Sequence, residues 1–316
     1  MAQTTIYYAS DVHGSDRCFR KFLNAAPFYR ADVLVMGGDI LGKAIVFLEE
    51  VRPGVFSATQ HERRIELSSE ADLQSFEKSA RDAGLYPYRC QPGELQALQD
   101  SGQIEPLFEQ LMKARLEEWM ALADERLAGS KVRCYIMGGN DDPPEVLEAL
   151  KTSRLVQDPD GQVVRIDEDC EMISCGWSNP TPWHTPRECS EEELGQRIDA
   201  MTRQARRPDQ AIMNLHVPPY GSGLDDAPEL DESLKVQTSL GQTKFKPVGS
   251  TAVRAAIERW QPLLGLHGHV HEAHAVVRIG RTVCINPGSD FGEGVLHGAL
   301  VTIKNGKLKG SQMVSG

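Results

Sequence analysis

The chain has 316 residues, of which 40% are hydrophobic and 25% are charged, as is ordinary for a globular protein with a large core. Its formal net charge of -11 argues against general affinity for nucleic acid or an anionic membrane, because both need clustered lysine and arginine. No secretion signal follows Met1 and no apolar run reaches the roughly 18 residues that span a bilayer, so we expect a soluble cytoplasmic protein.

Short apolar runs that end abruptly in polar turns indicate buried strands that deliver side chains to a site. The runs and the turns that follow them are 6–10 before Asp11-Val12-His13-Gly14, 32–36 before Gly37-Gly38-Asp39, 132–137 before Gly138-Gly139-Asn140-Asp141, 211–215 before His216, and 263–266 before His267-Gly268-His269-Val270-His271. Later runs at 275–279, 281–286 and 298–303 are joined by short turns and predict antiparallel pairing. Together they predict an α/β fold of two packed mixed β-sheets flanked by helices, a β-sandwich.

The interval 41–131 is far longer than a normal connection between a strand and a helix, and its patterns are mainly helical. Caps, stop signals and apolar spacing predict helices over 69–84, from 93 onward, and over 106–129. We therefore expect a single domain over residues 1–316 with a helical insertion or cap at about 60–129. Its apolar stripe must be covered by the body of the protein or by a second copy of the chain, which would make a homo-oligomer.

Two more helices, which begin after Ser190 and Ser250, each have one apolar face and predict covering layers on a sheet. Between them, residues 220–249 mix glycine, proline and both signs of charge without a period, which indicates a long loop. The seven cysteines are scattered without a Cys-x-x-Cys pair, so we expect reduced thiols rather than a disulfide framework or a zinc ribbon.

The polar residues at the predicted strand ends form a chemically coherent set of two aspartates, four histidines and an asparagine. They are Asp11, His13, Asp39, Asn140, His216, His269 and His271. Each motif alone occurs by chance in many chains, and a lone histidine is more often structural. Their joint occurrence at the C-terminal ends of strands, where α/β sheets place ligands, indicates one shared site. Residues two apart in an extended segment project to the same side, so each pair of neighbouring ligands can converge on one cavity.

In this order the motifs resemble those of the calcineurin-like metallophosphoesterase family: Asp-x-His, Gly-Asp, Gly-Asn-His-(Asp or Glu), a lone His and Gly-His-x-His. The match runs from the first predicted strand to the last sheet. The resemblance implies two divalent metal ions, with Mn²⁺ foremost and iron, zinc or nickel as alternatives, because imidazole and carboxylate ligands suit such ions. It further implies that one ion is held by Asp11, His13 and His271 and the other by Asn140, His216 and His269, with Asp39 as the bridge.

The same resemblance implies hydrolysis of a small-molecule phosphate ester by a metal-bound hydroxide, with Asn140, Asp141 and His216 as catalytic residues. Asp141 stands where the family has a histidine close to the phosphate. An ionised carboxylate there repels a monoester dianion more than a diester monoanion, which favours a phosphodiesterase; a protonated one can act as an acid instead. The alternatives are a phosphomonoesterase or nucleotide phosphatase, and a non-catalytic metal-binding scaffold.

Several neighbouring residues have both a functional and a structural interpretation. His274 either orients a metal-bound imidazole or lies on the surface of the next strand. The aromatic loop with Trp177, Trp183 and His184 either rims a pocket or is an ordinary exposed loop. We expect Asp142 to be a turn or helix-cap residue, and the turn at 286–289 to reflect turn chemistry alone.

Overall fold

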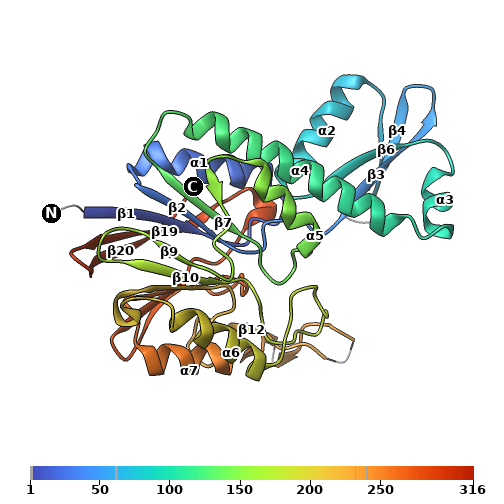
Figure 1. The fold of residues 1–316 in the computed structure, drawn as a ribbon. Coiled ribbons are helices and arrows are strands. Elements are labelled where there is room, and N and C mark those ends of the chain that lie inside the picture. The colour runs from blue at the N-terminus through green and yellow to red at the C-terminus, as the bar shows by residue number, and fades with distance from the viewer. Residues whose placement is uncertain (1–2, 61–62, 232, 240) are drawn as a thin grey trace.

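A computed structural model describes residues 3–60, 63–231, 233–239 and 241–316. Two six-stranded sheets pack face to face, and helices cover the outer face of each sheet, so the body of the protein has four layers (Figure 1). The predicted mixed α/β fold of two packed sheets flanked by helices is therefore confirmed.

The first sheet has the strand order β20-β19-β1-β2-β7-β8 and contains the N-terminal strands. Its strands are β1 (Gln3–Ala9), β2 (Val33–Gly37), β7 (Arg133–Met137), β8 (Val156–Gln157), β19 (His297–Lys304) and β20 (Lys307–Ser315). Strands β1, β2 and β7 are parallel, so their carboxyl ends meet at one edge. Strand β19 pairs antiparallel with β1 and β20. The predicted run 298–303 therefore lies in the first sheet, whereas the runs 275–279 and 281–286 lie in the second.

The second sheet has the strand order β17-β18-β16-β11-β10-β9. Its strands are β9 (Val163–Arg165), β10 (Glu171–Cys175), β11 (Ile212–Leu215), β16 (Leu264–Leu266), β17 (Ala275–Ile279) and β18 (Thr282–Asn286). Strands β10, β11, β16 and β18 are parallel, and β17 forms the predicted antiparallel pair with β18. Helices α6 (Glu191–Thr202) and α7 (Thr251–Trp260) cover this sheet, with Ser190 and Ser250 as their N-caps as predicted.

The core between the sheets follows from the two-residue period of the strands. In β1, Ile6 and Tyr8 face the second sheet, whereas Tyr7 and Ala9 face the helices on the other side. Both faces of the strand are thus buried, which explains its nearly continuous apolar sequence.

The segment between β2 and β7 contains a third sheet, with the order β5-β4-β3-β6. Its elements are β3 (Ile45–Arg52), β4 (Val55–Gln60), β5 (Arg63–Leu67), α2 (Glu70–Asp82), β6 (Tyr86–Cys90) and α3 (Glu94–Asp100). Helix α2 has the predicted Ser69 cap, but the expectation of a mainly helical segment was wrong for these strands. The small sheet encloses its own apolar cluster, which includes Leu48 and Leu73, and Figure 1 shows it beyond the end of the two main sheets.

Helix α4 (Ile104–Leu127) packs mainly in the main body, and its Phe108 also contacts Tyr86 of β6. It packs with α1 (Asp16–Tyr29) and the short α5 (Pro144–Leu147) in the layer over the first sheet. The Trp119 indole stacks on Phe19, with ring centroids 4.2 Å apart and planes 3° from parallel. The predicted apolar stripe is therefore covered by the body of the same chain.

We expect Trp119→Ala to lower the free energy of unfolding by about 3–5 kcal/mol, because it leaves a large cavity in this layer. The change also removes the indole N–H that donates to Asp16 Oδ1 at 2.6 Å. Trp183→Ala is the matched control, since that indole is 62% exposed, and we expect a change within about 0.5 kcal/mol. Urea unfolding of the three proteins measures both; equal midpoints would contradict the assignment of α4 to the core.

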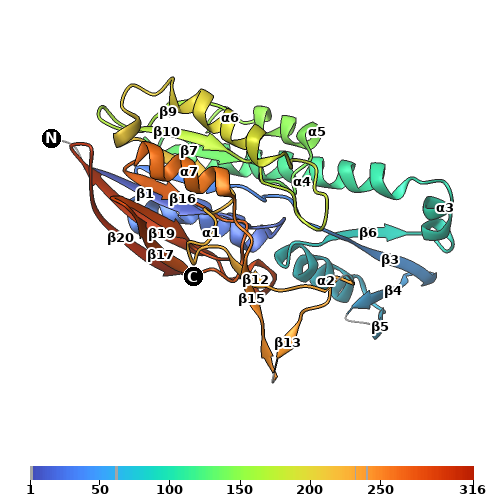
Figure 2. The same cartoon turned by 90° about the horizontal axis from the view of Figure 1, so that it is seen from below.

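Residues 220–249, expected as a loop, contain two short hairpin-like ladders. They are β12 (Asp226–Pro228) with β15 (Phe245–Pro247), and β13 (Thr238–Ser239) with β14 (Gln242–Thr243), and Figure 2 shows them projecting from the body. All seven cysteines are buried and unpaired, as expected. Within the part of the chain that the structure describes, no helix is long and apolar enough to cross a membrane.

Candidate metal centre

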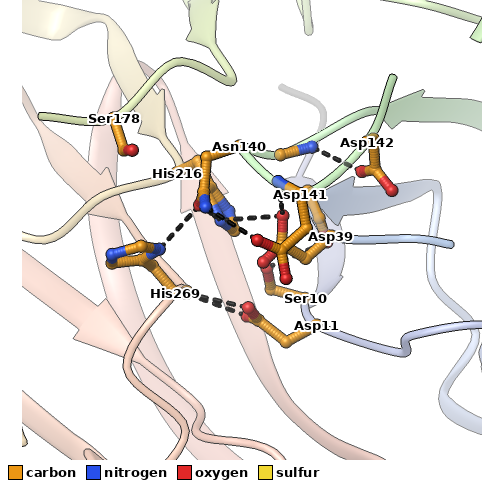
Figure 3. Close-up of polar contacts among 12 residues, drawn as sticks. Ser10, Asp11, Asp39, Asn140, Asp141, Asp142, Ser178, His216 and His269 are labelled. Carbon is orange, nitrogen blue, oxygen red and sulfur yellow. Dashed lines mark hydrogen bonds and ion pairs between the residues drawn. The ribbon is translucent and has the colours of Figure 1, made fainter. Parts of the chain in front are cut away.

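The carboxyl ends of β1, β2 and β7 in the first sheet meet those of β11 and β16 in the second, and polar side chains converge there (Figure 3). The loop after each strand supplies its predicted residues: Asp11 and His13 after β1, Asp39 after β2, Asn140 after β7, His216 after β11, and His269 and His271 after β16. This edge between the two packed sheets brings together residues as distant in sequence as His13 and His271. The structure therefore gathers all seven predicted ligands at one place.

The backbone at this edge is strained. The φ angles are 56° at Asp11, 39° at His13, 49° at Asp39 and 68° at His269, all in the left-handed region that non-glycine residues rarely adopt. Hydrogen bonds between the loops stabilise this backbone conformation. Asp11 N–H donates to Gly38 O and His13 N–H donates to Asp39 O, both at 3.0 Å. Strain of this kind collects at functional sites, where surrounding structure fixes side chains for a task.

Two glycines let these loops approach each other. Gly38 has a φ of 124°, and a Cβ there would lie 2.4 Å from His216 Nδ1. A Cβ on Gly139 would lie 2.1 Å from Asp39 Oδ1. Any side chain at either position would displace one of the converging groups.

The first group of converging atoms comes from Asp11, His13 and His271, whose ligand atoms lie within 4.8 Å of one another. His13 Nε2 is 3.0 Å from His271 Nε2, and His271 Nε2 is 3.6 Å from Asp11 Oδ1. Two imidazole nitrogens this close, with a carboxylate oxygen beside them, are a donor set that suits a shared divalent cation. His13 Nδ1 donates to Leu41 O at 3.3 Å, which leaves the Nε2 lone pair for a cation. The group fits a divalent metal ion.

The second group comes from Asp39, His216 and His269, joined by Asn140. His216 Nε2 lies 3.3 Å from Asp39 Oδ1 and 3.1 Å from Asn140 Oδ1, which in turn lies 2.7 Å from His269 Nδ1. His216 Nδ1 donates to Gly37 O at 3.0 Å, so its Nε2 lone pair also faces the group. The other carboxylate oxygen, Asp39 Oδ2, is 3.7 Å from His13 Nε2 in the first group. The two oxygens of Asp39 thus face different clusters.

The orientation of the Asn140 amide follows from its neighbours. Its Nδ2 donates to Thr185 Oγ1 and to Asp141 Oδ1, both at 2.9 Å. The Thr185 hydroxyl donates to Glu188 Oε1 at 2.7 Å, so its oxygen is free to accept from the amide. The carbonyl oxygen of Asn140 therefore points towards the histidines. Sequence reasoning missed Thr185, which lies 45 residues from its partner in a loop without a recognisable motif.

The ionisation of the group suits cation binding. Burial lowers the pKa of His13 to about 3 and that of His269 to about 4, so both imidazoles are neutral near pH 7. Burial raises the pKa of Asp11, but a hydrogen bond and the charges of nearby imidazoles lower it to about 2. Burial lowers the pKa of His216, whereas Asp39 and other neighbours raise it to about 9. A divalent cation would take the place of the proton on that ring.

Asp142 is a structural residue that connects two of these loops. Its buried carboxylate accepts from Ile40 N at 3.0 Å, Leu41 N at 2.8 Å and Gly139 N at 2.7 Å. The interpretation as a helix cap was wrong, because the N-cap of α5 is Pro143. Asp142 instead fixes the loop after β2 against the loop after β7.

The turn at 286–289 also has a role beyond turn chemistry. Asn286 Nδ2 donates to Gly268 O and Val270 O, both at 3.0 Å, on either side of a candidate ligand. Ser289 Oγ donates to Asp11 O at 2.6 Å. The turn therefore holds candidate ligand loops of both sheets in position.

The remaining candidates lie outside the cluster. His274 is exposed, and its Nδ1 donates to Pro287 O at 2.5 Å, which supports the surface interpretation. Trp177 packs against the Arg197 guanidinium, 4.2 Å from the ring centroid, whereas Trp183 and His184 are exposed.

Asp141, the residue that departs from the family pattern, has a partner that sequence reasoning missed. Lys43 Nζ lies 2.5 Å from Asp141 Oδ2. Asp141 itself can share a cation with His13 and Asp39, since their ligand atoms lie within 4.8 Å of one another. The only sequence signal for Lys43 was its place in the turn that follows Asp39.

No family model matches the chain. The chain is 29% identical over 151 residues to the uncharacterized protein MJ1162 of Methanocaldococcus jannaschii, covering 47% of this chain and 61% of that protein, less than two thirds of its length. The protein TT1561 of Thermus thermophilus aligns over 100% of this chain and 99% of its own, with a TM-score of 0.54 and 12% identity. This shows a common fold only. A structure of a novel archaeal phosphodiesterase aligns over 99% of this chain and 100% of its own, with a TM-score of 0.34 and 11% identity.

Proposed function

We propose that this chain is a metal-dependent phosphoesterase with two divalent ions at the meeting edge of its two main sheets. The observation that carries the proposal is the position of Asp39, whose Oδ2 faces the first group and whose Oδ1 faces the second. One carboxylate between two such groups can bridge a pair of ions. When bound, the ions would act as Lewis acids that activate water and stabilise charge on the phosphate.

The donor atoms support borderline divalent ions. Imidazole nitrogens, carboxylate oxygens and one amide oxygen suit Mn²⁺, Fe²⁺, Zn²⁺ or Ni²⁺, and among the described residues neither group includes a cysteine. We propose Asp11, His13 and His271 as ligands of one ion, and Asn140, His216 and His269 as ligands of the other.

The charge of the centre supports an anionic substrate. Two divalent ions contribute +4, and Asp11 and Asp39 contribute -2, so the filled centre attracts a phosphate group even though the whole chain is acidic. We propose a small-molecule phosphodiester as the leading class, because Asp141 stands in place of an imidazole and its ion pair with Lys43 supplies no net positive charge that would favour a dianion. A phosphomonoester is the second candidate. The ion pair between Lys43 and Asp141 favours it, because the lysine offsets the negative charge of that carboxylate.

We expect Mn²⁺ to raise the melting temperature of the metal-depleted protein by about 5–10 °C at concentrations near 100 times the dissociation constant, because the folded state alone presents the site. Hydrolysis of aryl phosphate esters should appear over the same range of metal concentrations. Differential scanning calorimetry, elemental analysis and initial rates measure the three quantities, with Zn²⁺ and Ni²⁺ compared in parallel.

His13→Ala and His274→Ala form a matched pair for this experiment. The first removes a buried nitrogen from the cluster, and the second removes an exposed imidazole outside it. Only His13→Ala should reduce the metal content and the shift in melting temperature. A protein that folds normally, binds no divalent metal and hydrolyses no ester would instead be a non-catalytic scaffold.

A further inference from the structure

The Lys43–Asp141 ion pair lies beside both candidate metal groups. Lys43 Nζ is 2.5 Å from Asp141 Oδ2, and the lysine side chain is 53% exposed while that of the aspartate is 16% exposed. Asp141 N–H donates to Asp39 Oδ1 at 3.1 Å, so the pair is attached to the carboxylate proposed as the bridge. A substrate phosphate at the centre would therefore be within reach of the electrostatic field of this pair.

The backbone that leads to Lys43 is rigidly fixed. Gly42 N–H donates to the Tyr86 hydroxyl at 3.1 Å, and a Cβ on Gly42 would lie 2.1 Å from Gly84 O. The two residues before Gly42 donate their N–H groups to the carboxylate of Asp142. Gly84, in the turn after α2, and Tyr86, the first residue of β6, thus position the start of the lysine side chain beside the candidate metal groups.

Both oxygens of the Asp141 carboxylate have donors. Oδ1 accepts from Asn140 Nδ2 at 2.9 Å, and Oδ2 faces the ammonium of Lys43. Without Lys43, this carboxylate would add one full negative charge beside the phosphate. With Lys43, the pair has no net charge, and the repulsion of an incoming anion is largely cancelled.

We propose that Lys43 determines which class of phosphate ester the centre accepts, by neutralising Asp141 so that dianionic monoesters as well as monoanionic diesters can enter. The inference rests on the proposed phosphoesterase function and names a specificity-determining residue for it. A dianion is repelled by an unpaired carboxylate twice as strongly as a monoanion at the same distance. Loss of Lys43 should therefore restrict the enzyme to diesters, and loss of the Asp141 charge should favour monoesters.

The test is a double-mutant cycle with Lys43→Met, Asp141→Asn and both changes together, measured on matched aryl monoester and diester substrates. We expect Lys43→Met to lower the monoester-to-diester ratio of kcat/KM about tenfold and Asp141→Asn to raise it about tenfold, since the pair is partly exposed and its field is screened. The double variant, in which the pair is again neutral, should return close to the wild-type ratio. The ratio cancels errors in the concentration of active enzyme.

Binding of inorganic phosphate and of dimethyl phosphate gives a readout that does not depend on turnover. By calorimetry at pH 8 with metal present, Lys43→Met should weaken phosphate binding about tenfold more than it weakens dimethyl phosphate binding, because the dianion is repelled twice as strongly. Lys151→Met is the matched control, because its ammonium also lies 2.5 Å from a carboxylate, that of Glu148, and both side chains are exposed on a short 3-10 helix. This control should change neither the monoester-to-diester ratio of kcat/KM nor the binding of phosphate and dimethyl phosphate.

Equal losses for both ester classes in Lys43→Met would overturn the inference and make the lysine a general structural or binding residue. Unchanged ratios in both single variants would overturn it as well. If the wild type hydrolyses no ester with any metal, the proposed function fails. The comparison of phosphate with dimethyl phosphate still decides the role of Lys43 in that case.

Discussion

Asp39→Ala is expected to reduce kcat/KM for phosphate esters by about 1000-fold or more and to remove more bound metal than any other single ligand change. Every other proposed ligand serves one ion, whereas the two oxygens of Asp39 face both groups. Its loss also removes the acceptor for the Asp141 N–H. Metal binding should therefore weaken at both candidate ion positions.

Elemental analysis and initial rates in saturating Mn²⁺ test this expectation. Asp226→Ala is the matched control, because that carboxylate is exposed on the projecting hairpin, and it should keep wild-type metal content and rate. Asp39→Asn preserves the shape of the side chain and separates loss of charge from loss of packing. An Asp39→Ala protein that still holds two ions tightly would show that the bridge has been assigned to the wrong residue.

Asp142→Ala is expected to destabilise the metal-free protein by about 3–5 kcal/mol, since it leaves three buried backbone N–H groups without an acceptor. Those groups belong to the loops that carry Asp39 and Asn140. The variant should therefore also bind metal more weakly, although Asp142 touches neither candidate ion position directly. Asp142→Asn should have an intermediate effect, because one carbonyl oxygen remains as an acceptor.

Urea unfolding in the presence of a chelator isolates the effect of Asp142 on the fold, and metal titration of the folded variants measures the effect on the centre. Reduced stability with unchanged metal affinity would mean that the two loops keep their relative positions without Asp142. Unchanged stability would show that water satisfies the three N–H groups.

The sequence predicted the elements whose pattern is local. Runs such as 32–36 and 132–137 became β2 and β7, and the serine caps of α2, α6 and α7 are in place. The seven proposed ligands were also predictable, because each directly follows a buried strand and the order of the motifs is distinctive. Their geometric convergence is observed, whereas their binding of metal remains a proposal.

Features that depend on distant partners could not be predicted. The apolar stripe of α4 has the same period whether it covers a cap or the main sheet, and only its contact with Phe19 decides. The strands of the small sheet were missed because the helical patterns in the interval 41–131 led to the prediction of a mainly helical segment. Lys43, Thr185 and Asn286 act through partners that no local spacing identifies.

The separation in sequence between the ligands of the first group has a consequence for folding. His13 and His271 are 258 residues apart, yet their Nε2 atoms lie 3.0 Å from each other. The metal centre therefore cannot assemble on a nascent chain until nearly all of it has been synthesised and both sheets have docked. An ion bound by both histidines would act as a reversible cross-link across a very long loop, whose closure is entropically costly. Metal binding would then report completion of the fold.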